Sequence, residues 1–289
     1  MNTNKIGLGC VTFGREIDRD ASFALLDEAA DRGISMFDTA AAYGDGASET
    51  ILGEWLCARG MSEICVATKI LPPFEAKSIA ENVEQSRERL GVATIDLLYL
   101  HSWESSAASP DCLAALDELV QKEVVKKLGI SNVDRVAFSK VLSCQDENGF
   151  ARFSALQNNF NYAVRDLDKD DFRFYQSESV DVITYSPLGA GFLTGKHKRG
   201  VESGSRFEVI PGHQDVYFHE QAWKRLAHLG EVASRFGCDQ AHLALAWVLH
   251  QPEIDCVLVG GRTVAHLDQA FTALEWENAG AFSELDQFL

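Results

Sequence analysis

The sequence is poor in basic residues for its size. Its 26 Lys and Arg face 43 Asp and Glu, which leaves a formal net charge of −17 at pH 7 over 289 residues. A surface this acidic repels phosphate backbones and anionic lipids, so we expect neither a nucleic acid nor a membrane among its partners. One bound polyanion is still compatible with this charge, provided that a local pocket of cations and backbone N–H groups overrides the global field.

Paired cysteines and long apolar runs are also missing. The seven cysteines are odd in number and scattered, and no two of them form C-x-x-C. This pattern is typical of free thiols in a reducing compartment. No apolar run approaches the roughly 18 residues of a membrane span, and no charged segment precedes an apolar stretch at the start. We therefore expect a cytoplasmic location.

Several nucleotide-binding and catalytic motifs are absent. The run Gly7-Leu-Gly9 reaches Gly14 without completing G-x-G-x-x-G, and neither G-x-S-x-G nor G-x-x-x-x-G-K-[ST] occurs. His219-Glu220 lacks the second histidine of a zinc helix, and no His/Cys cluster has the spacing of metal ligands. The sequence therefore predicts no classical Rossmann fingerprint, P-loop, serine hydrolase site or resident metal.

Short apolar runs rich in β-formers recur through the chain. They cover residues 6–9, 34–38, 63–69, 95–100, 127–131, 153–157, 181–185 and 255–259, and the first seven begin 26–32 residues apart. This spacing fits one strand, one helix and two short loops, and runs that are apolar throughout are typical of parallel strands covered on both faces. The length alone admits either two domains or one barrel of about 250 residues.

Segments of helical period separate these runs. The clearest are residues 21–32, 78–90, 111–121, 133–142, 220–236, 240–250 and 263–274, and no Pro/Gly/Ser-rich linker divides the chain. The alternation predicts an α/β fold in which residues 1–289 form a single (β/α)8 TIM barrel. Residues 189–215, after the seventh strand, are rich in Gly, Ser and Pro. We expect this long loop to be a lid over bound ligand, followed by extra helices.

Polar residues stand at the ends of the predicted strands. They are Asp38, Lys69, His101, Ser131, Asn132, Gln157 and Tyr185. The active sites of such barrels lie at the carboxyl ends of the strands, so these side chains are expected to ring one mouth. Taken singly, each has an alternative without a catalytic role: a turn cap for Asp38, a solvated side chain for Lys69 and a satisfied buried histidine for His101. Their joint occurrence at corresponding ends is harder to attribute to caps alone.

Tyr43 completes this set from the loop after the second strand, in FDTAAAYG. A phenol has a reference pKa of about 10 and becomes useful near neutral pH when a neighbouring ammonium favours the phenolate. Lys69 is placed to supply that charge, with Asp38 holding it protonated and a neutral His101 orienting a carbonyl oxygen. This combination suits protonation of a developing alkoxide while another group delivers hydride.

With these residues in place, the chain resembles the aldo-keto reductase family. The matching stretches are GLGCVTFG, FDTAAAYGDGASETILG, VATK, DLLYLH, GISN, LQNNFNYAVR, TYSPLGAGFLTGK and VGGRTVAHLDQA, in the family's order from residue 7 to residue 270. The resemblance implies a TIM barrel that uses a nicotinamide cofactor. It places the family's catalytic tetrad on Asp38, Tyr43, Lys69 and His101, with Tyr43 as the general acid for carbonyl reduction.

The resemblance also implies a set of cofactor contacts. Ser131, Asn132 and Gln157 would hold the nicotinamide carboxamide, and Tyr185 would stack on the ring, although a core aromatic is the alternative for Tyr185. The family's pyrophosphate loop falls on a further set of residues: Ser186, Leu188, Gly191 and Lys196.

Phosphate binding has independent support after the eighth strand. Gly260 and Gly261 allow a phosphate to approach the backbone, and Thr263 caps a predicted helix whose N–H groups attract anions. Arg262 stands where the family commonly contacts the adenosine 2′-phosphate, so the resemblance favours NADP(H); an exposed arginine without a role is the alternative. His266 and Ala270 replace a Gln and an Asn often found in the family, and His266 retains hydrogen-bonding capacity.

The leading hypothesis is an NADP(H)-dependent oxidoreductase that interconverts an aldehyde or ketone and its alcohol. Trp103 and Phe13 are expected either to line the substrate pocket or to be structural. A nicotinamide-binding regulatory or sensor subunit with slow turnover is the alternative function. A metal-assisted barrel hydrolase is a third possibility, and the sequence does not identify the substrate, the direction or the oligomeric state.

Overall fold

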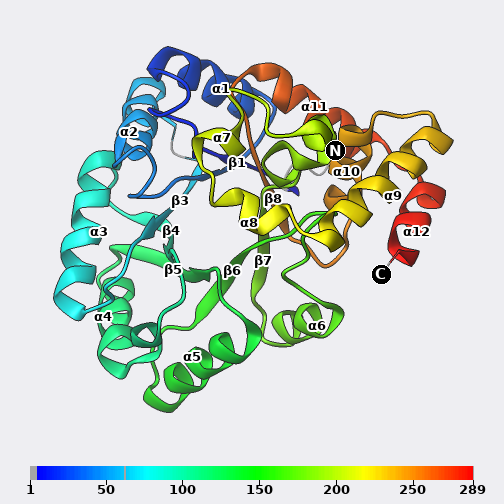
Figure 1. Ribbon diagram of the computed structural model, residues 1–289. Coiled ribbons are helices and arrows are strands. Elements are labelled where there is room, and N and C mark those ends of the chain that lie inside the picture. The colour runs from blue at the N-terminus through cyan, green and yellow to red at the C-terminus, as the bar shows by residue number, and fades with distance from the viewer. Residues whose placement is uncertain (1–4, 62, 289) are drawn as a thin grey trace.

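The chain forms a closed barrel of parallel strands (Figure 1). The computed structural model describes residues 5–61 and 63–288, apart from the side chains of residues 198 and 199. The eight strands are β1 (Ile6–Gly9), β2 (Met36–Asp38), β3 (Cys65–Ile70), β4 (Ile95–Leu100), β5 (Val125–Ser131), β6 (Phe153–Asn159), β7 (Asp181–Tyr185) and β8 (Cys256–Gly260). They pair in sequence order, and β1 closes the ring by pairing with β8. The predicted α/β class and TIM barrel are confirmed.

Helices surround the barrel. The α-helices are α1 (Arg19–Asp31), α2 (Ala47–Arg59), α3 (Ala76–Leu90), α4 (Pro110–Gln121), α5 (Arg135–Asn148), α6 (Lys169–Ser177), α7 (Arg206–Val209), α8 (His213–Tyr217), α9 (Glu220–Phe236), α10 (Gln240–Leu249), α11 (Val264–Glu275) and α12 (Ala279–Gln287). The 3₁₀ helices include η2 (Ser105–Ala108), η3 (Gly189–Thr194) and η4 (Lys196–Arg199). Sequence periodicity did not single out α2, α6 or α12.

The barrel interior is filled by side chains from several strands, as this fold requires. Leu97, Tyr99, Ala155 and Ile183 are at most 5% exposed and belong to one apolar cluster. Gly129 makes room for the Tyr99 ring, because a Cβ at Gly129 would lie 2.6 Å from two of the ring carbons. The interior is therefore a packed core and not a channel through the barrel.

The segment after β7 contains more structure than its composition indicated. The irregular loop expected at residues 189–215 contains η3, η4 and α7 and runs into α8. Aromatic packing fixes this segment: the ring centroids of Phe207 and Phe218 lie 4.9 Å apart, and those of Phe192 and Trp223 lie 4.7 Å apart. In Figure 1, α7 and α8 lie inside the ring of outer helices. Because α7 and the residues around α8 also line the mouth, this segment covers it.

Two further expectations concern the chain as a whole. All seven cysteines are free thiols. Across the described residues, no helix has the length and apolar character needed to cross a membrane.

Candidate active site

The polar strand ends converge on one cavity of about 730 Å³. Three of the four predicted catalytic residues line it: Asp38, Tyr43 and His101. So do all eleven predicted cofactor contacts: Ser131, Asn132, Gln157, Tyr185, Ser186, Leu188, Gly191, Lys196, Gly260, Arg262 and His266. A cavity of this size is large enough for an organic cofactor and a small substrate. The parallel register explains the convergence, since every strand ends at the same rim.

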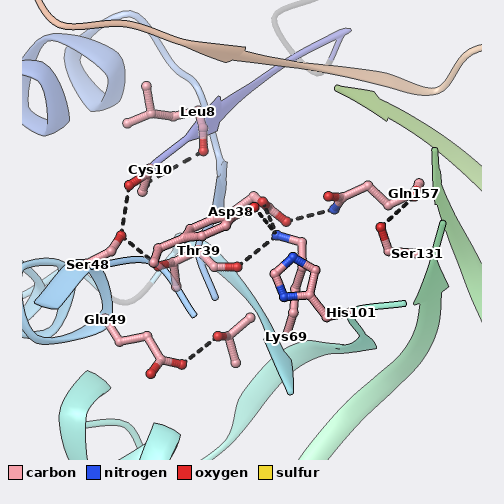
Figure 2. A network of polar contacts seen from close by, with 12 residues as sticks. Leu8, Cys10, Asp38, Thr39, Ser48, Glu49, Lys69, His101, Ser131 and Gln157 are labelled. Carbon is pink, nitrogen blue, oxygen red and sulfur yellow. Dashed lines mark hydrogen bonds and ion pairs between the residues drawn. The ribbon is translucent and has the colours of Figure 1, made fainter. Parts of the chain in front are cut away.

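Lys69 lies beneath the cavity floor rather than in its lining. Its side chain is 1% exposed, and its Nζ donates to Oδ1 of Asp38, which is 2% exposed. The same Nζ donates to the carbonyl oxygen of Thr39 over 2.8 Å and to the hydroxyl of Tyr43 over 3.3 Å. Figure 2 shows Lys69 directed at Asp38, with Gln157 reaching Asp38 from another strand. The ammonium is thereby held below the phenol.

Charge at this position is maintained by the ion pair. Burial disfavours the Lys69 ammonium, but attraction to Asp38 and Tyr43 outweighs it and raises the pKa of Lys69. The Asp38 carboxylate is satisfied on both oxygens, because Nε2 of Gln157 donates to Oδ2 over 2.8 Å. Buried charges persist in proteins only when they are paired and hydrogen-bonded in this way. The lysine is therefore a fixed cation at neutral pH.

Tyr43 sits on a turn that several hydrogen bonds hold in place. The amide of Tyr43 donates to Ala40 and its carbonyl accepts from the amide of Ser48. The Ser48 hydroxyl donates to the carbonyl of Cys10 and also contacts the Thr39 hydroxyl, each over 2.8 Å, which ties the turn to β1 and β2 (Figure 2). These contacts fix the backbone from which the phenol reaches over the mouth.

The pKa of Tyr43 is shifted in the opposite direction to the one expected from a neighbouring ammonium alone. Lys69 does approach the hydroxyl and lowers its pKa, as expected, but burial has the larger effect and the pKa of Tyr43 is raised overall. The reason is that a phenolate loses more by desolvation here than one shared ammonium restores. Tyr43 therefore carries its proton at neutral pH, as a proton donor must.

His101 follows β4 and stands edge-on to Tyr43, with ring centroids 5.7 Å apart at an interplanar angle of 81°. Burial, reinforced by the Lys69 charge, lowers the pKa of His101 to about 4. Its Nδ1 is buried and has no hydrogen-bond partner within the described chain. The imidazole is therefore neutral near pH 7, and such a ring can donate one N–H to an oxygen placed between it and Tyr43.

The polar side chains expected to hold the nicotinamide already form hydrogen bonds with neighbouring residues of the site. The hydroxyl of Ser131 donates to the carbonyl of Gln157 over 2.7 Å, and Nδ2 of Asn132 donates to the carbonyl of His101 over 2.9 Å. The hydroxyl of Tyr185 donates to Oδ1 of Asn132 over 2.6 Å. These contacts orient the groups without consuming all of their capacity, and they set the Tyr185 ring at the cavity wall.

Two residues at this rim adopt the left-handed backbone region. Asn132 has φ 56° and Ser186 has φ 57°, values that are uncommon outside glycine. Both line the cavity directly after a strand end. Such strained conformations cluster at functional sites, where the surrounding structure holds them in place.

The far end of the cavity has the chemistry of an anion site. The added Cβ at Gly260 would approach only the Gly9 carbonyl, at 3.3 Å, so the backbone there faces the cavity. The Thr263 side chain makes no capping hydrogen bond to α11 and instead contacts Nδ1 of His266 over 3.0 Å. The first turn of α11 therefore keeps N–H groups for an anion, and the exposed side chains of Arg262 and Lys196 add charge. These residues fit the phosphates of a dinucleotide.

The two residues considered for the substrate pocket, Phe13 and Trp103, are not among the described residues that line the cavity. Phe13 is fully buried in the hydrophobic core and is not among the described residues that line the cavity. Trp103 is half-buried against the same core and is likewise not a lining residue in the part of the chain that is described. The packing of both side chains on the core agrees with the second alternative stated for them, a structural role.

Sequence reasoning missed several lining residues. The main ones are Thr12, Arg15, Arg206, Ile210, His213 and Gln269. Arg206 and His213 belong to the segment after β7, whose lack of period concealed which side chains turn inward. The sequence offered one signal for Arg206: it is a basic residue in a Gly/Ser-rich stretch of an otherwise acidic chain. Among the residues described, no group of His, Cys, Asp and Glu is arranged to hold a metal ion.

Comparison with known proteins identifies the family. The model of the Aldo/keto reductase family matches residues 5–284. The chain belongs to this family. The resemblance carried by its motifs is thereby confirmed, and the aldo/keto reductase assignment extends over nearly the whole barrel. The protein is therefore an oxidoreductase of the aldo/keto reductase family.

Relatives of this aldo/keto reductase share most of its length. The chain is 30% identical over 295 residues to norsolorinic acid reductase B of Aspergillus parasiticus, covering 92% of this chain and 75% of that one. It is 28% identical over 315 residues to protein tas of Escherichia coli, covering 96% and 91%. The glycerol dehydrogenase AKR11B4 from Gluconobacter oxydans has a similar fold, with a TM-score of 0.80 at 23% identity over 99% of this chain and 91% of that one.

Proposed function

We propose that the protein is an NADP(H)-dependent oxidoreductase that interconverts an aldehyde or ketone and its alcohol, with Tyr43 as the proton donor. The observation that carries this proposal is the linked set of Asp38, Lys69, Tyr43 and His101 at one cavity floor. The relative norsolorinic acid reductase B and the structurally similar glycerol dehydrogenase are named for the same class of chemistry, which supports the proposal.

Tyr43 and His101 act on the carbonyl oxygen in this proposal. Their facing rings leave a place for that oxygen, with a protonated phenol on one side and a neutral imidazole N–H on the other. When bound, the reduced nicotinamide supplies the hydride for the carbonyl carbon. Tyr43 gives its proton to the developing alkoxide, and Lys69 below it stabilises the phenolate that remains. In the reverse direction Tyr43 accepts the proton.

Residues around the mouth would hold the cofactor. Ser131, Asn132 and Gln157 are assigned to the carboxamide, and Tyr185 to the ring face. The pyrophosphate contacts assigned are Ser186, Leu188, Gly191, Lys196 and Gly260, with Arg262 on the 2′-phosphate and His266 beside the adenosine. All of them line the same cavity, which is the support for placing one extended ligand along it. Arg262 is the reason for proposing NADP(H) over NAD(H).

The test is the consumption of NADPH with a panel of aldehydes, for wild type and for Tyr43→Phe. We expect the variant to lose about 10²–10⁴-fold in kcat, the range of general acid catalysis, while NADPH still quenches tryptophan fluorescence with unchanged affinity. Tyr175→Phe is the matched control, because its buried hydroxyl has no partner in the described structure. If wild type and Tyr43→Phe are equally slow with every aldehyde while the cofactor still binds, the sensor alternative replaces this proposal.

A further inference from the structure

The lining of the cavity is cationic although the chain is acidic. Four basic side chains line it, namely Arg15, Lys196, Arg206 and Arg262. The only carboxylate among the lining residues of the described chain is Asp38, and it already accepts hydrogen bonds from Lys69 and Gln157. The cavity therefore presents positive charge inside a protein of net charge −17, and such a local field selects anionic ligands.

The ion pairs distinguish two of these cations from the others, although Arg262 is near enough to Arg206 to contribute to the lowering of its pKa. Arg262 and Lys196 belong to the end assigned to the cofactor phosphates. Arg15 and Arg206 meet at the carboxylate of Glu16, in the loop after β1. That loop lies against the turn that carries Tyr43, because a Cβ added at Gly44 would lie 3.3 Å from the Phe13 carbonyl oxygen. Arg206 is therefore at the Tyr43 end of the cavity, where the substrate must bind.

Arg206 has hydrogen-bonding capacity to spare. Arg15 occupies both oxygens of Glu16, with Nε and Nη2 donating over 2.8 and 2.6 Å. Arg206 reaches the same carboxylate only through Nη1 at 3.5 Å, its single side-chain hydrogen bond to the described residues. A guanidinium has five N–H donors, so most of those on Arg206 remain for a ligand.

The surroundings of Arg206 also leave its charge uncompensated. Two guanidinium groups share one carboxylate, so one positive charge is left over. Burial, together with the nearby Arg15, lowers the pKa of Arg206. The side chain is held in this place because its neighbour Phe207 is fully buried among Tyr217, Phe218 and His197. An anion in the cavity would complete the cluster.

We infer that Arg206 determines substrate specificity by binding a carboxylate that the substrate carries in addition to its reactive carbonyl. This inference rests on the proposed function and names its substrate class: an oxo acid, reduced to the corresponding hydroxy acid. The carbonyl gains a hydride and the Tyr43 proton, the nicotinamide is oxidised by two electrons, and the carboxylate is unchanged. Arg206 recognises it through the planar, two-pronged geometry that guanidinium and carboxylate groups share.

The experiment compares 4-carboxybenzaldehyde with its methyl ester, because the two have the same aldehyde and differ by one charge. Wild type is expected to show a kcat/KM at least about 10-fold higher for the acid. Arg206→Gln should lose about 10- to 100-fold with the acid, mainly through KM, and stay within about 2-fold of wild type with the ester. Arg206→Lys should recover part of the loss, since it restores the charge without the fork.

Two controls separate this role from others. Arg173→Gln removes an equal charge from an exposed ion pair on α6 and should leave both substrates unaffected. The Kd for NADPH, measured by fluorescence, should be the same for wild type and Arg206→Gln. Equal loss with acid and ester together with a weaker Kd for NADPH would make Arg206 a cofactor-phosphate contact and overturn the inference.

The remaining outcomes are also decisive. If wild type reduces acid and ester equally well, the inference is wrong and the proposed function stands, because carbonyls are still reduced. If no aldehyde of either kind is reduced although NADPH binds, the proposed function fails and the inference fails with it.

Discussion

Lys69 and Asp38 form an ion pair beneath the cavity, in which the two side chains are 1% and 2% exposed. The pair joins the end of β2 to β3, which are neighbours in the barrel. Two charges removed from water stabilise one another only as a pair, so loss of one partner costs more than loss of both. The pair therefore links the chemistry of the site to the stability of the barrel.

Asp38→Asn should therefore destabilise the protein strongly. Lys69 would be left as an unpaired buried cation, and removal of one partner of such a pair typically costs about 3–5 kcal/mol. The double variant Asp38→Asn/Lys69→Met should be more stable than Asp38→Asn, because it removes the orphaned charge. Urea unfolding of wild type, Asp38→Asn and the double variant measures their free energies of unfolding. Both variants should also lose reductase activity.

A surface pair supplies the control for this comparison. Asp20 is 93% exposed in its side chain and pairs with Arg19 on α1. Asp20→Asn should cost less than about 1 kcal/mol, as exposed pairs do. Equal unfolding free energies for Asp38→Asn and Asp20→Asn would rule out the ion pair as an important contribution.

His101 should make the stability of the fold depend on pH. Its pKa falls from 6.5 to about 4 on folding. Between these values the unfolded chain binds more protons at this site than the folded protein, so stability is full above pH 6.5 and falls as the pH is lowered toward 4. From pH 7 to pH 5 this group accounts for a loss of about 2 kcal/mol.

His101→Gln removes this titration while keeping a polar side chain of similar reach. Urea unfolding at pH 7 and pH 5 should show a smaller difference for the variant than for wild type, by about 2 kcal/mol. Other histidines whose pKa burial lowers, such as the half-buried His213, titrate in both proteins and cancel in the comparison. Parallel stability profiles for the two proteins would contradict a neutral, buried His101.

Arg262 should decide between the two nicotinamide cofactors. Arg262→Ala is expected to raise the Kd for NADPH about 10- to 100-fold, because a charge-assisted contact to a phosphate is lost, and to leave the Kd for NADH unchanged. Fluorescence titration with both cofactors measures the ratio. Arg262→Lys should retain part of the preference, and a ratio unaffected by Arg262→Ala would refute this assignment.

The strand pattern was the most informative part of the sequence. Every predicted apolar run corresponds to a strand, and β1, β4 and β7 have the predicted bounds. Some observed strand boundaries differ from the predicted ones, because apolar residues beside a strand do not always join its hydrogen-bond ladder. An example is β2, which begins at Met36 rather than at residue 34. The helix α2 was not recognised, because its apolar residues stand beside Gly53, which packs against the backbone of Arg89 and Leu90 and interrupts a regular pattern.

The candidate site was predictable where its residues end strands. Asp38, Ser131 and Tyr185 could be placed at one mouth because parallel strands in a barrel end together. Arg206 and His213 could not, because their positions depend on short helices that aromatic packing holds in place, as between Phe207 and Phe218, and this packing leaves no regular period in the sequence. Phe13 was ambiguous for a related reason: burial of a ring near a mouth depends on which side of its loop faces the core.

The barrel and the residues at the carboxyl ends of its strands were predictable from the sequence, because the alternation of apolar runs and helical segments is a local property repeated along the chain. Only the tertiary structure decided the electrostatics of the site. Burial raises the pKa of Tyr43 and lowers that of His101, and Lys69 stays charged because Asp38 lies beside it in the folded barrel. Charge and burial depend on neighbours that are distant in sequence, so folding has to bring them together before the chemistry exists.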